Sequence, residues 1–162
     1  MPDVLTHLMV GISVALLVRR DDNRPQQMLI ILGALLIDIE RPITWLLELT
    51  DFGWIELTSA SHSILGAVIL SYFAAACIHL EDTELRNRAI LIFIGCLSHL
   101  ILDLVMYPWP EIGLYLLYPL KIPFSFNLLW PDFPYYPLFG VVTLTLALIA
   151  RRIVIYRTRA DS

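Results

Sequence analysis

The sequence predicts an all-α, polytopic membrane protein, with about five transmembrane helices in a single domain, residues 1–162. Of the 162 residues, 58% are hydrophobic and only 16% are charged, and the mean hydropathy is +0.73. These values are far from those of an average soluble domain. The charged residues gather between long apolar runs. With a net charge of -4 and 11 Lys and Arg spread over separate loops, the chain has no basic surface for a nucleic-acid partner.

Five apolar runs mark the expected helices, most of them near the 20 or so residues that cross a bilayer. They lie at about residues 4–18, 28–47, 61–79, 89–106 and 137–156. The first run is followed, rather than preceded, by Arg19 and Arg20, which is the reverse of a secretory signal peptide, so we expect it to remain in the mature protein.

Two of the runs contain irregular points. Pro42 cannot donate a hydrogen bond to the carbonyl of Asp38, so the second helix is expected to kink or open there and to turn Glu40 toward the same side as Asp38. The third helix is expected to begin with Ser59 as its cap, which puts His62 in the first turn.

Orientation follows from Lys and Arg, which are enriched in cytoplasmic loops. Nine arginines lie in residues 19–27, 80–88 and 151–162, whereas the other side has only Arg41 and Lys121. The N-terminus is therefore expected outside and the C-terminus in the cytoplasm. Five crossings are consistent with this orientation, because an odd number of crossings puts the two ends on opposite sides of the membrane. We expect a multi-pass protein of a prokaryotic cell membrane.

Ionisable side chains fall at similar depths in four of the helices. At about 1.5 Å rise per residue they lie roughly 15–21 Å from the cytoplasmic ends, one of them somewhat higher. Such groups are costly in a membrane and are functional by default. The residues are His7, Asp38, Glu40, His62, His99 and Asp103. We predict that they converge on one site in the outer half of the bilayer.

A divalent metal ion is the expected occupant of this site. His99 and Asp103 are four residues apart and share a helix face, so both can reach one point. Imidazoles with carboxylates suit Zn²⁺ best, with Mn²⁺ or Fe²⁺ as alternatives, and the number of candidate ligands allows one or two ions. Glu40 is the candidate general base. The chain has no HExxH motif, which counts against a common metalloprotease arrangement.

Other interpretations stay open for single residues. Asp38 or Asp103 can instead form a buried ion pair with Arg41, and Asp3 can either hold His7 or cap the first helix. A purely structural polar network is the alternative to a metal site.

Four glycines support convergence of the helices. Gly11, Gly33, Gly66 and Gly95 each lie about one turn toward the cytoplasm from a polar residue of the site. Small residues let membrane helices approach closely, so these glycines are expected to draw four helices together. The alternative is that glycine is simply common in membrane helices.

The segment 107–136 is rich in proline and in aromatic residues. Aromatic rings favour the membrane interface, so the segment is expected to form either a lid or lateral gate over the site or a plain aromatic belt. Arg41 and Lys121, the only cations on that side, are candidates for binding a substrate phosphate.

The order of "LTHLMVG", "GALLIDIERP", "SASHSILGAV", "GCLSHLILDLV" and "LLYPL" resembles the LexA-binding, inner-membrane-associated metal-dependent hydrolases, over roughly residues 5–121. The resemblance implies distant similarity to zinc-dependent phospholipase C, and implies metal binding at His7, Asp38, His62, His99 and Asp103, with Glu40 at an acidic position. The chain departs from that family at Ile37, where members have proline, and at residues 57–59, where members have a histidine-arginine-glycine run.

The sequence thus favours an enzyme, a membrane-embedded metal-dependent hydrolase acting on a phospholipid or another lipid-linked phosphoester at the extracytoplasmic side. One alternative is a divalent-metal or proton transporter that uses the same residues. Another is a scaffold stabilised by a metal, which would unfold when the ion is lost.

Overall fold

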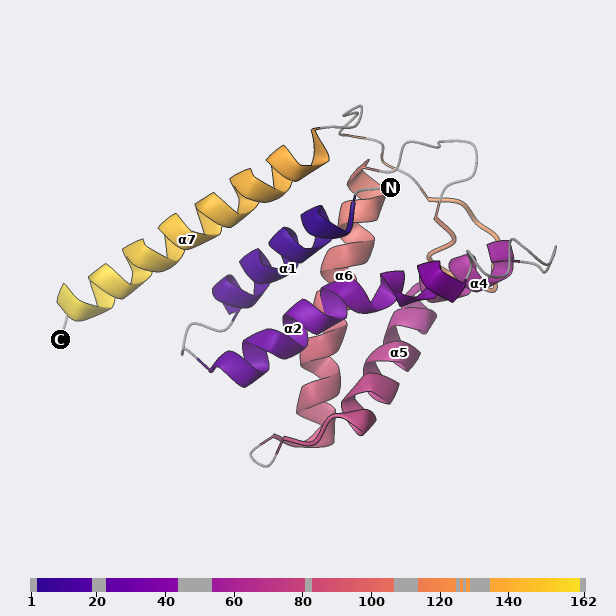
Figure 1. The fold of residues 1–162 in the computed structure, drawn as a ribbon, viewed down its shortest axis with the longest axis horizontal. Helices are drawn as coiled ribbons and strands as arrows, with labels where there is room; N and C mark the ends of the chain where they lie inside the picture. Colours follow the sequence, from indigo (N-terminus) through magenta and orange to yellow (C-terminus); the bar gives the residue numbers. More distant parts are fainter. Residues whose placement is uncertain are drawn as a thin grey trace.

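The computed structural model describes residues 3–18, 23–43, 54–80, 83–106, 114–124, 126, 128 and 135–160. The regular elements of these ranges are helices, as Figure 1 shows: α1 (Val4–Val18), α2 (Arg24–Leu36), the 3-10 helix η1 (Ile37–Glu40), α4 (Trp54–Ser61), α5 (Ile64–Cys77), α6 (Leu85–Met106) and α7 (Tyr136–Ala160). The predicted all-α fold is confirmed, and each predicted apolar run contributes a helix.

Two helices in the described ranges are long and apolar enough to cross a membrane, namely Leu85–Val105 and Tyr136–Arg157. The helices α1 and α5 are apolar but have only 15 and 14 residues, fewer than the 20 or so that span a bilayer. Five crossings and an outside N-terminus therefore stay predictions.

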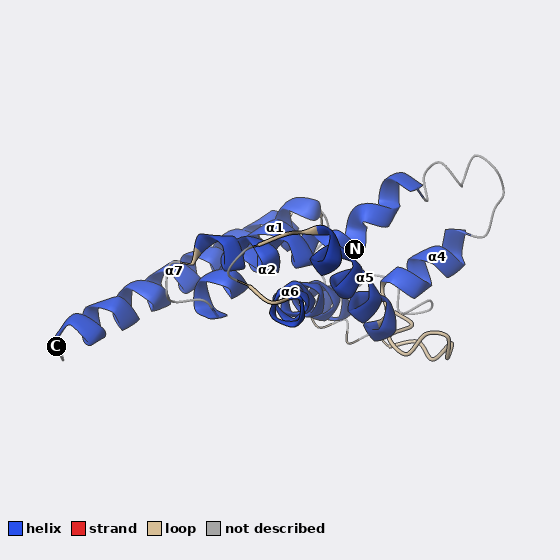
Figure 2. Ribbon diagram, turned by 90° about the horizontal axis from the view of Figure 1, so that it is seen from below, coloured by secondary structure: helices blue, strands red, loops and turns tan. Residues whose placement is uncertain are grey.

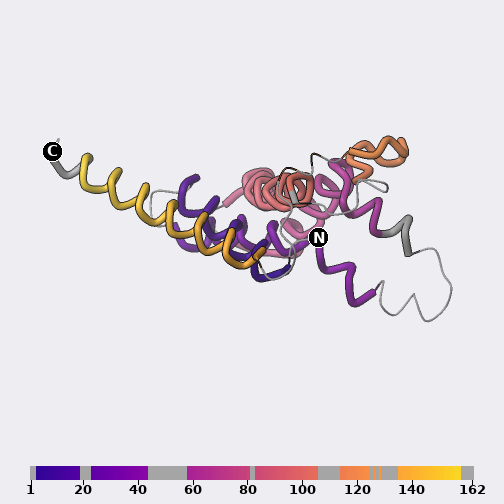
Figure 3. Tube along the Cα trace, turned by 90° about the horizontal axis from the view of Figure 1, so that it is seen from above, coloured from indigo at the N-terminus to yellow at the C-terminus, as the bar shows by residue number. Residues whose placement is uncertain are grey.

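The helices pack side by side around α2 and α6. Helix α2 crosses α6 and also contacts α1, while α5 packs along α6 (Figures 1 and 2). Helix α7 lies against α1 at the edge of the bundle, and its C-terminal part extends beyond the other helices (Figure 3). The apolar core lies between α2 and α6, where Ile30, Ile92 and Cys96 are fully buried.

Glycines allow the close crossing of α2 and α6. A Cβ atom on Gly33 would overlap the carbonyl oxygen of Ile92, and one on Gly95 would overlap the carbonyl oxygen of Ile30. In the same layer, a Cβ on Gly11 of α1 would meet the Cβ of Ala34 at 2.6 Å. The predicted close approach of helices at these glycines is confirmed.

The irregular turn η1 has the cause that the sequence indicated. Pro42 has no N–H for the carbonyl of Asp38, and the backbone N–H of Arg41 donates to that carbonyl instead. Hydrogen bonds between residues three positions apart, rather than four, define the 3-10 helix, which is wound more tightly than an α-helix. Both Asp38 and Glu40 are buried as a result.

The third predicted helix is broken in the structure. Ser59 lies inside α4 and does not begin a helix, so its predicted capping role was wrong. The helix is interrupted at His62 and Ser63, and the Ser63 hydroxyl donates to the carbonyl of Ala60 and accepts from the N–H of Gly66. A Cβ on Gly66 would overlap the Ala60 carbonyl oxygen. This glycine therefore permits the sharp break between α4 and α5, and not the predicted approach of this segment to the other helices of the site. Interrupted backbone at membrane depth is tolerated where it is buried in protein or lines a cavity.

Candidate metal centre

The structure gathers the predicted site residues from distant parts of the chain into one buried cluster. Helix α1 contributes His7, η1 contributes Asp38, the break between α4 and α5 contributes His62, and α6 contributes both His99 and Asp103. The three histidines are each 1% exposed, Asp103 is 0% exposed and Asp38 is 7% exposed.

Four donor atoms of this cluster face one another. The Nε2 atom of His62 lies 3.8 Å from Oδ1 of Asp38 and 3.6 Å from Oδ2 of Asp103. The Nε2 atom of His99 lies 3.7 Å and 3.3 Å from the same two oxygens. The rings of His62 and His99 are inclined by 64°, so their in-plane lone pairs can point to a common centre.

These spacings are close to those between the ligands of a bound divalent ion. Donors at about 2.0–2.2 Å from a tetrahedral zinc are separated from one another by about 3.3–3.6 Å. Hydrogen bonds would be shorter, with the heavy atoms about 2.7–3.2 Å apart. The distances of 3.3–3.8 Å between the carboxylate oxygens and the Nε2 atoms are closer to these ligand separations than to hydrogen-bond lengths. The described residues form two groups that could hold an ion, Asp38, His62 and His99 in one and His7, His99 and Asp103 in the other.

Unsatisfied polar atoms support the same interpretation. Among the described residues, the Nε2 atoms of His62 and His99 and both carboxylate oxygens of Asp103 are buried without a hydrogen-bond partner. Leaving such groups unpaired in a protein interior is costly. The cluster therefore lacks a partner for these atoms, and a cation is the partner that imidazole lone pairs and carboxylates share.

Neighbouring groups fix how two of the imidazoles are turned. The Nδ1 atom of His99 lies 2.8 Å from the carbonyl oxygen of Ala34 on α2. The Nδ1 atom of His62 lies 3.2 Å from the carbonyl oxygen of Thr58 and 3.4 Å from Oε1 of Glu40. A carbonyl oxygen can only accept a hydrogen bond, so Nδ1 carries the proton in both rings and the Nε2 lone pair is directed at the centre, as in metal-bound histidines.

Glu40 lies behind His62, on the opposite side of the ring from the donor centre. Its Oε2 atom accepts a 2.6 Å hydrogen bond from the hydroxyl of Ser61, which is also 3.1 Å from Nδ1 of His62. Sequence reasoning did not select Ser61. The feature that could have pointed to Ser61 is its position next to the candidate ligand His62 in "TSASHS". No spacing rule, however, connects Ser61 to Glu40, 21 residues earlier.

Arg41 links the cluster to the surface. Its Nε atom lies 2.8 Å from Oδ1 of Asp38, while its side chain is 39% exposed. The alternative that Asp38 pairs with Arg41 is thus seen in the structure, yet the same oxygen also faces His62 and His99. Lys121 is exposed on the segment 114–124, and its role in substrate binding stays a prediction.

Asp3 caps helix α1. Its carboxylate accepts from the backbone N–H and the hydroxyl of Thr6 at 2.9 Å and 2.6 Å. Partial burial raises the pKa of Asp3, but the hydrogen bonds from Thr6 outweigh it, so the pKa lies below its ordinary value. Of the two roles considered for Asp3, the structure supports the cap. Among the described residues, Asp3 and His7 are joined by a backbone hydrogen bond, in which the N–H of His7 donates to the carbonyl of Asp3 at 3.2 Å.

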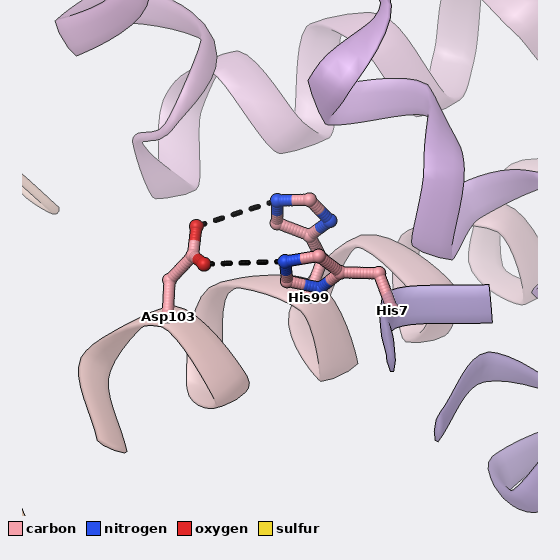
Figure 4. A group of neighbouring side chains, drawn as sticks. All are labelled: His7, His99 and Asp103. Carbon is pink, nitrogen blue, oxygen red and sulfur yellow. Dashed lines mark ion pairs between the residues drawn. The ribbon is translucent and has the colours of Figure 1, made fainter. Parts of the chain in front are cut away.

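His7 occupies a separate position in the cluster. Its ring is stacked on that of His99 (Figure 4). The ring centroids are 3.7 Å apart and the planes are inclined by 11°. The Nε2 atom of each ring lies 3.3 Å from its own oxygen of Asp103, Oδ1 for His7 and Oδ2 for His99. Asp103 therefore contacts all three histidines.

Part of the aromatic segment is attached next to the cluster. The N–H of Ile64, two residues after His62, donates to the carbonyl of Leu116 at 2.9 Å. The N–H of Phe126 donates to the carbonyl of Leu104, one residue after Asp103, at 3.1 Å. Residues 107–113, 125, 127 and 129–134 of the segment lie outside the described residues.

Comparison with known proteins gives one similarity that covers nearly the whole chain. A family model described as YdjM inner membrane protein matches residues 1–159. No curated protein and no solved structure matches the chain. The match agrees with the membrane character of the sequence and with the resemblance to an inner-membrane family.

Proposed function

The chain belongs to the YdjM inner membrane protein family, and we propose that it is a membrane-embedded, metal-dependent hydrolase of a lipid-linked phosphoester. The observation that carries this proposal is the close set of buried donor atoms from Asp38, His62, His99 and Asp103. Among the described residues, three of these atoms, Nε2 of His62, Nε2 of His99 and Oδ2 of Asp103, have no hydrogen-bond partner. Zn²⁺ fits the donor set best, and Mn²⁺ or Fe²⁺ are the alternatives.

The roles of the residues follow from their positions. The four donors would hold the ion, which would supply a Lewis acid and an activated water for attack on phosphorus. Arg41 reaches from the exposed surface to Asp38, and its planar guanidinium suits an anionic phosphoryl group. The substrate would thus meet the site at the side from which Arg41 enters.

A lipid substrate fits the surroundings of the site. The described part of the aromatic segment is hydrogen-bonded to the chain beside His62 and Asp103, which is where the predicted lid would need to lie. Toward the N-terminal half of α6, Ile92 and Cys96 are fully buried in an apolar core. In the described residues, this apolar core lies on that side of the donors, where a transporter would need a polar path, and it therefore favours an enzyme over the alternative of a metal or proton transporter.

The test is hydrolysis by the purified protein in liposomes, after loading with Zn²⁺ or Mn²⁺. Phospholipids and isoprenoid phosphates are supplied in the bilayer, and released products are measured. We expect metal-dependent product formation that is lost in His99→Ala. Transport of Mn²⁺ into the liposomes, with no product from any phosphoester lipid, would instead favour the transporter.

Glu40 gives a prediction that separates two roles. Its contacts with Ser61 and with Nδ1 of His62 support a positioning residue, whereas the sequence suggested a general base. In Glu40→Gln we therefore expect metal affinity to fall by about 10–100-fold, as for other groups that orient metal ligands. Titration with a fluorescent zinc chelator measures this affinity. Unchanged affinity with loss of hydrolysis would instead support the general base.

A further inference from the structure

We propose that the centre holds two metal ions, with Asp103 bridging them and His7 binding the second ion. This inference rests on the proposed metal centre and adds the number of ions and the ligand that distinguishes them. It starts from the stacked rings of His7 and His99 in Figure 4.

Stacked imidazoles cannot easily share one ion. The lone pair of a ring nitrogen lies in the plane of its ring, and the planes of His7 and His99 are nearly parallel, 11° apart, with centroids 3.7 Å apart. Their Nε2 lone pairs therefore run side by side instead of converging. Two ions, one in each ring plane, would be separated by a distance close to the ring spacing, and paired catalytic metals lie about 3.5–4 Å apart.

The carboxylate of Asp103 has the arrangement that a bridge requires. Its Oδ1 atom lies 3.3 Å from Nε2 of His7, and its Oδ2 atom lies 3.3 Å from Nε2 of His99 and 3.6 Å from Nε2 of His62. Each oxygen thus faces a different donor group. Both oxygens, and both ring nitrogens of His7, are buried without a hydrogen-bond partner among the described residues.

The two metal positions differ in the number of ligands that the protein supplies and in whether the imidazoles are held in orientation. The first has Asp38, His62 and His99 beside Oδ2 of Asp103, and both of its imidazoles are oriented through Nδ1. At the second, the described residues offer His7 and Oδ1 of Asp103, and Nδ1 of His7 has no such partner. The second ion should bind at least about ten-fold more weakly and should leave coordination positions open for phosphoryl oxygens, as in two-metal phosphoester chemistry.

The experiment measures metal stoichiometry and magnetic coupling in detergent-purified full-length protein titrated with Mn²⁺. We expect wild type to bind two ions and to give an exchange-coupled electron paramagnetic resonance spectrum. We expect His7→Ala and His7→Gln to bind one ion and to give the spectrum of isolated Mn²⁺. The control is His79→Ala, because His79 is an exposed histidine just beyond α5, and this variant should behave as wild type. Thermal unfolding confirms that each variant is folded.

Each alternative outcome is distinct. One ion in wild type, or two coupled ions in both His7 variants, would overturn the second site while leaving the proposed hydrolase intact. Binding of no ion by wild type would contradict the second site and the proposed function together. Two ions without magnetic coupling would contradict the bridge by Asp103.

Discussion

Replacing Asp103 with asparagine is expected to remove metal binding from a protein that still folds. Asp103 is fully buried and lies within 3.6 Å of the Nε2 atoms of all three histidines. The amide has nearly the same shape but no negative charge, and its NH₂ group cannot serve as a ligand. We expect metal affinity to fall by more than the roughly 100-fold attributed to outer groups, and hydrolysis to disappear.

Isothermal titration with Zn²⁺ measures this loss, and thermal unfolding without metal tests whether the variant folds. The matched control is Asp3→Asn, which makes the same chemical change at the cap of α1, outside the cluster. Asparagine caps helices as well as aspartate does, so this control should bind metal as wild type does. Normal metal affinity in Asp103→Asn would remove Asp103 from the ligand set.

Replacing Gly95 with alanine is expected to have the largest effect on stability. Helix propensity alone predicts a gain of about 0.5–1 kcal/mol. However, the new Cβ would overlap the carbonyl oxygen of Ile30 and would lie 2.7 Å from the backbone nitrogen of Ala34. Backbone atoms can yield only if α2 and α6 separate, so we expect a net loss of about 1–3 kcal/mol.

The same separation should weaken metal binding, because Nδ1 of His99 is held by the Ala34 carbonyl across this crossing. Thermal unfolding in detergent and metal affinity are measured together. The matched control is Gly140→Ala on α7, where a Cβ would meet the flexible end of the Met9 side chain. That control should unfold near the wild-type temperature. A Gly95→Ala protein as stable as wild type would show that the crossing tolerates a side chain.

Much of the site could be predicted because helical spacing is regular. The spacing of His99 and Asp103 fixes a shared face, and the similar depth of His7, Asp38 and His99 follows from the rise per residue. Pro42 identified the irregular turn because the missing N–H is a property of the residue itself. These features depend on one residue or on one helix at a time.

The remaining features depend on contacts between segments. The helix was expected to begin at Ser59, but Ser63 caps α5 because its hydroxyl bonds both to Ala60 and to Gly66. No local pattern distinguishes these two serines. The hydrogen bond from Ser61 to Glu40 spans 21 residues, and the stacking of His7 on His99 depends on how α1 meets α6. Helix periodicity does not contain this information.

The central claim is that the buried cluster is a metal centre, and metal content tests it most directly. Wild type and His99→Ala are purified in detergent, incubated with Zn²⁺ or Mn²⁺, washed, and analysed by mass spectrometry, with thermal unfolding of the same samples. We predict stoichiometric metal in wild type and its loss in a folded His99→Ala protein. A folded wild-type protein that stays metal-free after this incubation would contradict the account and leave a structural polar network in its place.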